Sequence, residues 1–259
     1  MLAIDRQRII LDRLLAESSV RVVDLAKTIG VAGETIRRDL DQLEQQGLLR
    51  RVHGGAVSIW QEDKERQFKE REGLRIPEKR AIGVRAAELV ENGDTIIVDV
   101  GTTALLFCEA LLGKQNLTVI TPSFKAALLA QQACSARVIV TGGELQHEEP
   151  YLWGYLAEAT LRQFHVHRAF LSAGGLTLDT GITDYNDREV HMRKVMAECA
   201  SQVIVMADSS KMGVRAFSVV GSLSIMDMLV TDQGLHPVMR EKLEELGIEV
   251  ILANTQDVD

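Results

Sequence analysis

The sequence predicts an α/β protein in two parts, a small and mainly helical N-terminal domain followed by a larger domain with a mostly parallel sheet. The 259 residues, 46 % of them hydrophobic and 25 % charged, suffice for one large core and one small core. Helical patterns fill the start of the chain, whereas apolar strands alternate with helical stretches beyond Arg80. We therefore expect an N-terminal domain over residues 1–59, a charged linker over 60–76 and a second domain over 77–259.

The N-terminal domain begins with three helical patterns. The first covers residues 5–17 and has Asp5 in position to cap it; the second ends at Gly30, a residue typical of helix ends. The third covers residues 34–46 and ends before Gly47. Apolar positions at helical spacing define these patterns: Ile10, Leu11, Leu14 and Leu15 in the first, Val22, Leu25, Ala26 and Ile29 in the second, and Ile36, Leu40 and Leu43 in the third.

The third helix has a polar face that suits DNA. At about 100° per residue, Thr35, Arg38 and Gln42 lie opposite the apolar stripe, with Arg37 on the flank. A helix that enters the major groove needs such donors, because arginine bonds guanine edges with two hydrogen bonds and also clamps phosphates. We expect these four side chains to contact DNA.

A β-hairpin is expected directly after the third helix. Two short apolar segments, residues 48–52 and 56–59, flank a glycine-containing turn. Three helices followed by a basic hairpin are typical of a winged helix-turn-helix, and the hairpin is its wing. Near its turn, Arg50, Arg51 and His53 are expected to contact the sugar–phosphate backbone, which positions a domain without reading sequence.

Residues 61–80 form a charged, partly helical connector with Pro77 near its end.

Seven apolar segments of the C-terminal part that follows have the features of strands. The strands are expected over residues 95–99, 117–121, 137–141, 168–173, 203–207, 228–231 and 249–252. Because they alternate with helical stretches, the sheet should be mostly parallel, and ligands bind such sheets at the carboxyl ends of the strands.

The first loop at these strand ends is a candidate phosphate cradle. It contains Asp99, Gly101, Thr102 and Thr103 and leads into a helix expected over residues 104–112. Glycine allows a close approach of the backbone, the threonines offer hydroxyls, and the free amides at a helix start attract an anion.

Three further loops follow strands in the same way. Two of them contain glycine pairs whose amides are expected to line the pocket, and in the fourth a lysine neutralises a phosphate while Asp208 or Asp99 accepts sugar hydroxyls. Glu189, on a helix after Asp184, is expected to add a polar contact. The residues added by these loops are Gly142, Gly143, Gly174, Gly175, Asp208 and Lys211.

The chain resembles the DeoR family of bacterial regulators over nearly its whole length. The matching motifs are Thr35-Ile36-Arg37-Arg38-Asp39-Leu40, Leu43, Gly47 and His53-Gly54-Gly55-Ala56 in the first domain, and Asp99, Gly101-Thr102-Thr103, Gly142-Gly143, Gly154, Ala169-Phe170-Leu171, Glu189, Asp208 and Ser210-Lys211 in the second. The resemblance implies a sensor domain similar in fold to ribose-phosphate isomerases and coenzyme A transferases, with phosphorylated sugars as effectors. It also implies an effector-contacting Lys79 at the entry to that domain, for which surface charge is the alternative interpretation.

The sequence departs from this family at several loops. Ala32 stands where the family usually has a capping serine, a loss of about 1 kcal/mol. Pro122, Val100, Ser172 and Gly174 alter loops beside the expected phosphate position. The departures leave the identity of the sugar, or of a polyol acid phosphate in its place, open.

The resemblance and the residues together predict a repressor of a sugar-catabolic operon that binds double-stranded operator DNA as a homo-oligomer, dimer or tetramer, and is controlled by a phosphorylated sugar. The alternative is a sugar-phosphate isomerase or transferase with a DNA-binding appendage, in which Asp99, Asp184 and Glu189 supply acid–base groups. A nonspecific nucleic-acid binder is disfavoured, because the near-neutral first domain neutralises few phosphates.

Composition limits the other possibilities. The net charge of −8 is uneven, with nine Lys and Arg against eight Asp and Glu up to Trp60 and 20 against 29 in the remainder. Cys108, Cys134 and Cys199 are far apart and lack metal-ligand spacing, so we expect buried free thiols, no metal and no cofactor. No apolar run reaches the ~20 residues of a membrane span, which predicts a cytoplasmic protein.

Overall fold

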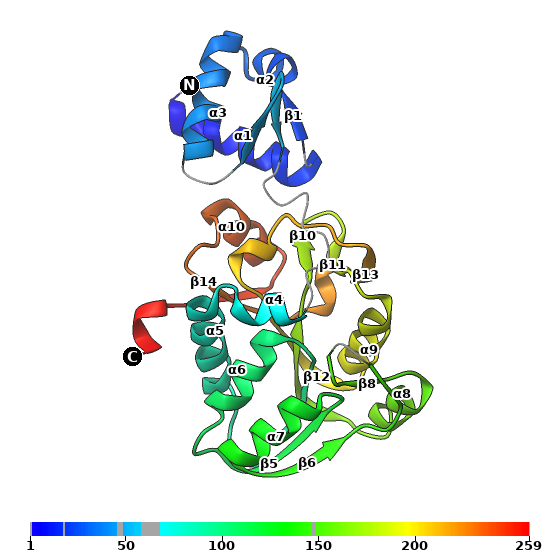
Figure 1. The fold of residues 1–259 in the computed structure, drawn as a ribbon. Helices are drawn as coiled ribbons and strands as arrows, with labels where there is room; N and C mark the ends of the chain where they lie inside the picture. The colour runs from blue at the N-terminus through cyan, green and yellow to red at the C-terminus, as the bar shows by residue number, and fades with distance from the viewer. Residues whose placement is uncertain (1, 18, 46–48, 58–67, 147–148, 259) are drawn as a thin grey trace.

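The computed structural model describes residues 2–17, 19–45, 49–57, 68–146 and 149–258. Figure 1 shows two domains, with the first helices and strands at one end of the molecule and a large sheet with its helices at the other. Among the described residues, no helix combines the length and the apolar character needed to cross a bilayer.

The N-terminal domain packs three helices against a three-stranded antiparallel sheet of order β1-β3-β2. Its elements are α1 (Ala3–Glu17), β1 (Ser19–Arg21), α2 (Val22–Ile29), α3 (Gly33–Gln45), β2 (Arg50–Val52) and β3 (Gly55–Val57). The predicted apolar stripes meet in one core, in which Ile10, Leu25, Ile36 and Leu40 have no exposed surface. The three helices and the hairpin are confirmed, and Gly30 ends α2 in the left-handed conformation with φ of 75°.

Three details of this domain differ from the prediction. Helix α1 begins at Ala3, so Asp5 lies in its first turn and accepts a hydrogen bond from the Leu2 amide at 3.2 Å instead of capping the helix. Helix α3 begins at Gly33, where the Ala32 carbonyl accepts the first hydrogen bonds. Strand β1 was not predicted, because in three residues only one side chain is buried and no alternation is visible. The ends predicted at residues 46–48 and 58–59 lie outside the described residues.

Gly55 is required by the packing of the wing. A Cβ atom at this position would lie 2.0 Å from the Val20 carbonyl oxygen, which is impossible without moving backbone. Strand β3 therefore approaches β1 this closely only with glycine, and the motif that carried the family resemblance has a packing reason.

The C-terminal domain contains a seven-stranded sheet of order β15-β14-β12-β9-β4-β5-β6, and all its strand pairs are parallel. Its strands are β4 (Thr95–Val98), β5 (Gln115–Thr121), β6 (Ser135–Val140), β9 (Val166–Ser172), β12 (Ala200–Met206), β14 (Met228–Asp232) and β15 (Glu249–Ala253). All seven predicted strands are confirmed, and so is the parallel arrangement.

Helices cover both faces of this sheet. One face packs against α5 (Ile76–Glu88), α6 (Thr102–Ala110) and α7 (Phe124–Ala133), the other against α8 (Tyr155–Leu161), α9 (Asp187–Glu198) and α10 (Pro237–Glu245). The strands are apolar on both sides for this reason: Ile96 and Val98 belong to the first core, whereas Ile97 between them belongs to the second.

Smaller elements surround the sheet. They are α4 (Phe68–Gly73), the pair β7 (Glu144–Leu145) and β8 (Leu152–Trp153), the antiparallel strands β10 (Gly175–Thr177), β11 (Gly181–Asp184) and β13 (Ser218–Gly221), and the 3-10 helices η1 (Ser209–Lys211), η2 (Leu223–Ile225) and η3 (Thr255–Val258). The three cysteines are buried and free.

The strand order creates a switch point between β4 and β9. From β4 the chain adds β5 and β6 on one side and then returns to add β9, β12, β14 and β15 on the other. The connections at the carboxyl ends of β4 and β9 therefore leave in opposite directions and open a crevice, the usual ligand position in such sheets.

Candidate functional site

The exposed face of α3 carries an arginine with no partner in the described part of the chain. Thr35, Arg38 and Gln42 line a shallow surface hollow together with Arg6 and Asp39. Arg38 is exposed, and among the described residues its guanidinium makes no hydrogen bond or ion pair. The four predicted α3 residues are thus placed on the surface, and one of them offers its full donor set to a ligand.

Helix α1 holds α3 in a defined orientation. The Arg6 guanidinium donates two hydrogen bonds to the Asp39 carboxylate, at 2.7 and 3.0 Å, and Asp39 is buried. At the next turn the Gln7 amide donates to Gln42 Oε1 at 2.8 Å. A two-point contact of this kind fixes direction as well as distance, so the face of α3 is presented rigidly.

The remaining residues that are predicted to contact DNA differ in their exposure and in their contacts. Arg37 is exposed and forms a surface ion pair with Glu34 at 2.9 Å, which is worth little in water. Arg50 and His53 are exposed on the wing. Arg51 instead lies against α3, where its guanidinium donates to the Arg37 carbonyl at 3.3 Å and lies 3.5 Å from Asp41. Arg51 thus ties the wing to the helix.

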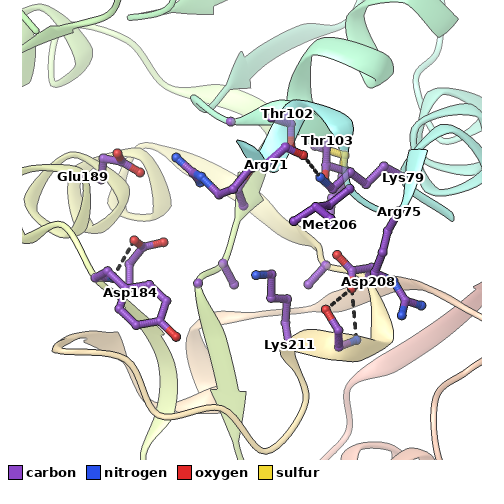
Figure 2. A pocket seen from close by; sticks show the side chains of 18 residues that line it. Arg71, Arg75, Lys79, Thr102, Thr103, Asp184, Glu189, Met206, Asp208 and Lys211 are labelled. Atoms are coloured by element: carbon purple, nitrogen blue, oxygen red, sulfur yellow. Dashed lines mark hydrogen bonds and ion pairs between the residues drawn. The ribbon is translucent and has the colours of Figure 1, made fainter. Parts of the chain in front are cut away.

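A cavity of about 210 Å³ opens at the switch point of the large sheet (Figure 2). It lies at the carboxyl ends of β4, β9 and β12. Eight of the twelve predicted effector residues line it, and they come from five separate places in the chain: Lys79, Gly101, Thr102, Thr103, Gly174, Glu189, Asp208 and Lys211. The two segments that we expect to hold a phosphate, around Gly101 and Lys211, therefore meet.

Two lysines contribute positive charge to this cavity. Lys79 is 6 % exposed and donates to the Arg71 carbonyl, and its burial lowers its pKa to about 8, against the opposing attraction of Asp208. Lys211 projects into the cavity in Figure 2, and no hydrogen bond or ion pair holds its ammonium within the described part of the chain. Lys211 is half-buried at the cavity, and its ammonium has no partner in the described part of the chain, so it is a natural position for an anion.

The start of α6 completes the positive end of the cavity. Gly101 precedes the helix with φ of 120°, a conformation that favours glycine, and no side chain of the neighbouring sequence caps the helix. Thr102 and Thr103 form the first turn and line the cavity. The amides and the positive end of the helix dipole therefore face the same space as the two lysines.

Four predicted effector residues do not line the cavity. Gly142 and Gly143 follow the edge strand β6, and β5 separates that strand from β4. Gly175 packs against Val214, whose carbonyl oxygen would lie 2.2 Å from an added Cβ. Asp99 is buried below the cavity floor and accepts hydrogen bonds from the Ser172 amide and Arg193. A glycine pair after a strand does not show where that strand lies in the sheet. That position decides whether the loop lines the cavity.

A buried arginine organises the acidic end of the site. Arg193 is 1 % exposed and forms ion pairs with Asp99 at 2.6 Å, Asp184 at 2.7 Å and Glu189 at 2.8 Å. Burial raises the pKa of Glu189 to about 7, while the adjacent guanidinium acts in the opposite direction. The cluster joins the ends of β4 and β11 to α9.

The sequence analysis missed four charged residues of this site. Arg71 and Arg75 line the cavity from the segment that we assigned to the linker, where charge alone indicated solvent. Arg75 lies 3.1 Å from Asp208 and adopts a left-handed conformation at the start of α5. Arg193 and the buried Glu149 gave no signal, because an arginine four residues after a glutamate on a helix usually indicates a surface pair.

No group of three His, Cys, Asp or Glu side chains in the described part of the chain is arranged to hold a metal ion. The site is thus a cavity with an anion-attracting end at α6 and the lysines and an acidic end at Asp184 and Glu189.

Two family models match the chain. Residues 6–62 match the DeoR-like helix-turn-helix domain, and residues 75–233 match the DeoR C terminal sensor domain. The second match alone covers more than half of the chain.

Relatives with similar lengths carry regulator names. A Bacillus subtilis (strain 168) protein named uncharacterized HTH-type transcriptional regulator YulB is 42 % identical and covers 96 % of each chain. A protein of Escherichia coli O157:H7 named putative aga operon transcriptional repressor is 30 % identical and covers 96 % of this chain and 93 % of its own length. Among solved structures, ribose 5-phosphate isomerase A from Methanocaldococcus jannaschii has a TM-score of 0.38 and 21 % identity, and covers 52 % of this chain and 53 % of its own.

Proposed function

The chain belongs to the DeoR family of DNA-binding transcription regulators, and from this premise we propose that it is a repressor of a sugar-catabolic operon controlled by a phosphorylated sugar or a related phosphorylated metabolite. The observation that carries the effector assignment is the meeting of Lys79, Lys211 and the start of α6 around one cavity. The acidic end of that cavity is suited to accept hydrogen bonds from the hydroxyls of a sugar.

The proposed switch works in the cytoplasm on a homo-oligomer whose paired DNA-binding domains meet two half-sites. A ligand changes operator affinity only when it binds one arrangement of these domains more tightly than the other. The cavity wall includes Arg71 on α4, the first described element after the wing. Occupancy of the cavity is thereby linked to the chain segment that leads to the DNA-binding domain.

The decisive experiment is a gel shift on the intergenic region next to the gene, repeated with a panel of sugar phosphates. The proposal expects a specific complex with the bare protein and a change in its midpoint with one class of phosphorylated compound. If the protein binds this region and random DNA equally well, the proposed repressor role is contradicted. If no phosphorylated compound changes the complex, the proposed control by such an effector is contradicted.

Replacement of Arg38 by alanine is expected to weaken operator binding by about 1–3 kcal/mol, the usual loss when an arginine that reads a base is removed. The reason is its exposed and unpaired guanidinium on α3. Fluorescence anisotropy with labelled operator measures the effect. Arg85→Ala is the matched control, because Arg85 is an exposed arginine of the other domain. Equal affinity of Arg38→Ala and the native protein would exclude a DNA contact.

The affinity of the protein for a phosphorylated sugar is expected to have a maximum between pH ~6 and pH ~8. The ligand gains its second charge above its pKa of about 6. Lys79 is charged in the empty protein only below its lowered pKa of about 8. Above that pH, binding must return a proton to Lys79, so affinity falls by up to about tenfold per pH unit. Isothermal titration calorimetry from pH 5 to pH 9 measures how this affinity depends on pH.

Two comparisons isolate the lysine in that experiment. Sulfate keeps its charge over this range, so it should show the alkaline fall without the acidic rise. Lys79→Met should bind more weakly and lose the alkaline fall. An alkaline fall that persists in Lys79→Met assigns the titration to another group.

The enzyme alternative finds little support in the geometry. Asp184 accepts hydrogen bonds from Arg193 and from the amides of Tyr185 and Asn186, so both of its oxygens are engaged. Glu189 is engaged in the same way by Arg193 and the Asn186 side chain. Carboxylates that serve a structural cluster in this manner are poorly placed to transfer protons to a sugar.

A further inference from the structure

Glu149 is a buried carboxylate that belongs to neither end of the cavity. It is 5 % exposed and lies in the loop before β8. Its Oε1 accepts a hydrogen bond from the Gly101 amide at 3.1 Å, and its Oε2 lies 3.5 Å from Arg71 Nη2. Both partners line the cavity, so Glu149 reaches the wall of the cavity from behind.

These two partners are groups that an anionic ligand would use. The Gly101 amide stands at the start of α6, beside Thr102 and Thr103, and the Arg71 guanidinium lines the same cavity. A carboxylate of the chain itself, Glu149, accepts the hydrogen bond of this amide. Glu149 therefore takes the place of a negative group at the positive end of the helix.

Polar atoms around this contact remain unsatisfied. Arg71 Nε and Ser172 Oγ are both buried and find no hydrogen-bond partner among the described residues, and a Cβ at Gly101 would lie 3.1 Å from Ser172 Oγ. Buried polar atoms are normally paired, so their state indicates a place for further acceptor oxygens. A phosphate has more acceptor oxygens than a carboxylate.

The Glu149 contact is also weaker than those of the neighbouring carboxylates. Its ion pair with Arg71 is long, at 3.5 Å, whereas Arg193 holds its three carboxylates at 2.6–2.8 Å. Glu149 is also repelled by Glu189 and Asp99, and burial together with this repulsion raises its pKa to about 8. Among the carboxylates around the site, Glu149 is therefore the one that a ligand displaces at the lowest cost.

We propose that Glu149 is an internal competitor of the effector, which occupies the Gly101 amide and Arg71 in the empty protein and yields both to the phosphate group of the ligand. The inference rests on the proposed function of this cavity. Glu149 then sets the affinity threshold, since a ligand must supply a stronger anion than a carboxylate. The exchange also transfers Arg71 on α4 from a protein partner to the ligand.

The test is calorimetric titration of the full-length protein and its variants with inorganic phosphate. Glu149→Ala should bind phosphate about tenfold more tightly, the effect of releasing one competing hydrogen bond. Glu149→Gln should show a smaller gain, because its amide oxygen still accepts from Gly101. Glu144→Gln, which neutralises an exposed carboxylate on β7, should bind like the native protein.

The outcomes separate this inference from the proposed function. If Glu149→Ala binds phosphate with weaker or unchanged affinity, the proposal that Glu149 competes with the ligand is overturned. If the alanine variant does not fold, the phosphate affinity of Glu149→Gln provides the same test. If the native protein binds phosphate, Lys211→Ala does not, and the Glu149 variants are unchanged, only the inference fails. If neither the native protein nor any Glu149 variant binds phosphate, both fail.

Discussion

Replacement of Arg193 by alanine is expected to destabilise the protein by about 3–5 kcal/mol, the cost of leaving buried charges without their partner. The guanidinium is 1 % exposed and meets Asp99, Asp184 and Glu189 within 2.8 Å. Its removal leaves three carboxylates in an interior where neither water nor another cation replaces it. Urea unfolding followed by Trp153 fluorescence measures the change.

The pH dependence of this loss provides a second readout. At low pH the buried Asp99 and Glu189, whose pKa values burial raises, become protonated and lose their repulsion, so Arg193→Ala should be less destabilised at pH 5 than at pH 8. The matched control is Arg240→Ala, because Arg240 forms an exposed pair with Glu244 on α10 and should change stability by about 0.5 kcal/mol or less. A loss below about 1 kcal/mol in Arg193→Ala contradicts the central role of the cluster.

The second large effect is expected for Ile36→Ala in α3. Ile36 has no exposed surface and packs in the core shared by α1, α2 and α3. Truncation of a buried isoleucine costs about 2–5 kcal/mol, which is most of the stability of a domain this small. Operator binding should therefore be lost while phosphate binding by the other domain continues.

Anisotropy with labelled operator and calorimetry with phosphate measure the two activities of Ile36→Ala side by side. Val23→Ala is the control, because Val23 on α2 is 75 % exposed and its truncation leaves no cavity. Loss of both activities together would show that the two domains do not fold independently. Retention of full operator affinity would show that the core of this domain tolerates the cavity.

The domain organisation and nearly all the large elements followed from local patterns. Periodicity placed three helices, a hairpin and seven strands, because burial on one or both faces leaves a repeat of 3.6 or a continuous apolar run. Gly30 and Gly101 could also be recognised from the sequence, because each stands where the backbone requires glycine. Strand β1 was not, because a strand of three residues has no repeat.

Strand order was the information that the patterns lacked. The loops after β4, β6, β9 and β12 are all rich in glycine or in small and polar residues, and only the order of the sheet places three of them around one cavity and Gly142 and Gly143 at an edge. Loop composition therefore identified candidate residues but not the pocket.

Short spacings that a helix or a strand end imposes were enough to predict a helix-turn-helix domain joined to an α/β domain with glycine-rich and polar loops at its strand ends. Only the tertiary structure decided which charges meet. Arg193 and Glu149 look like surface residues along the chain, and α4 looks like linker, since pairing between residues up to 94 positions apart leaves no local mark. The buried cluster and the occupied Gly101 amide exist because folding brings those distant side chains into one interior.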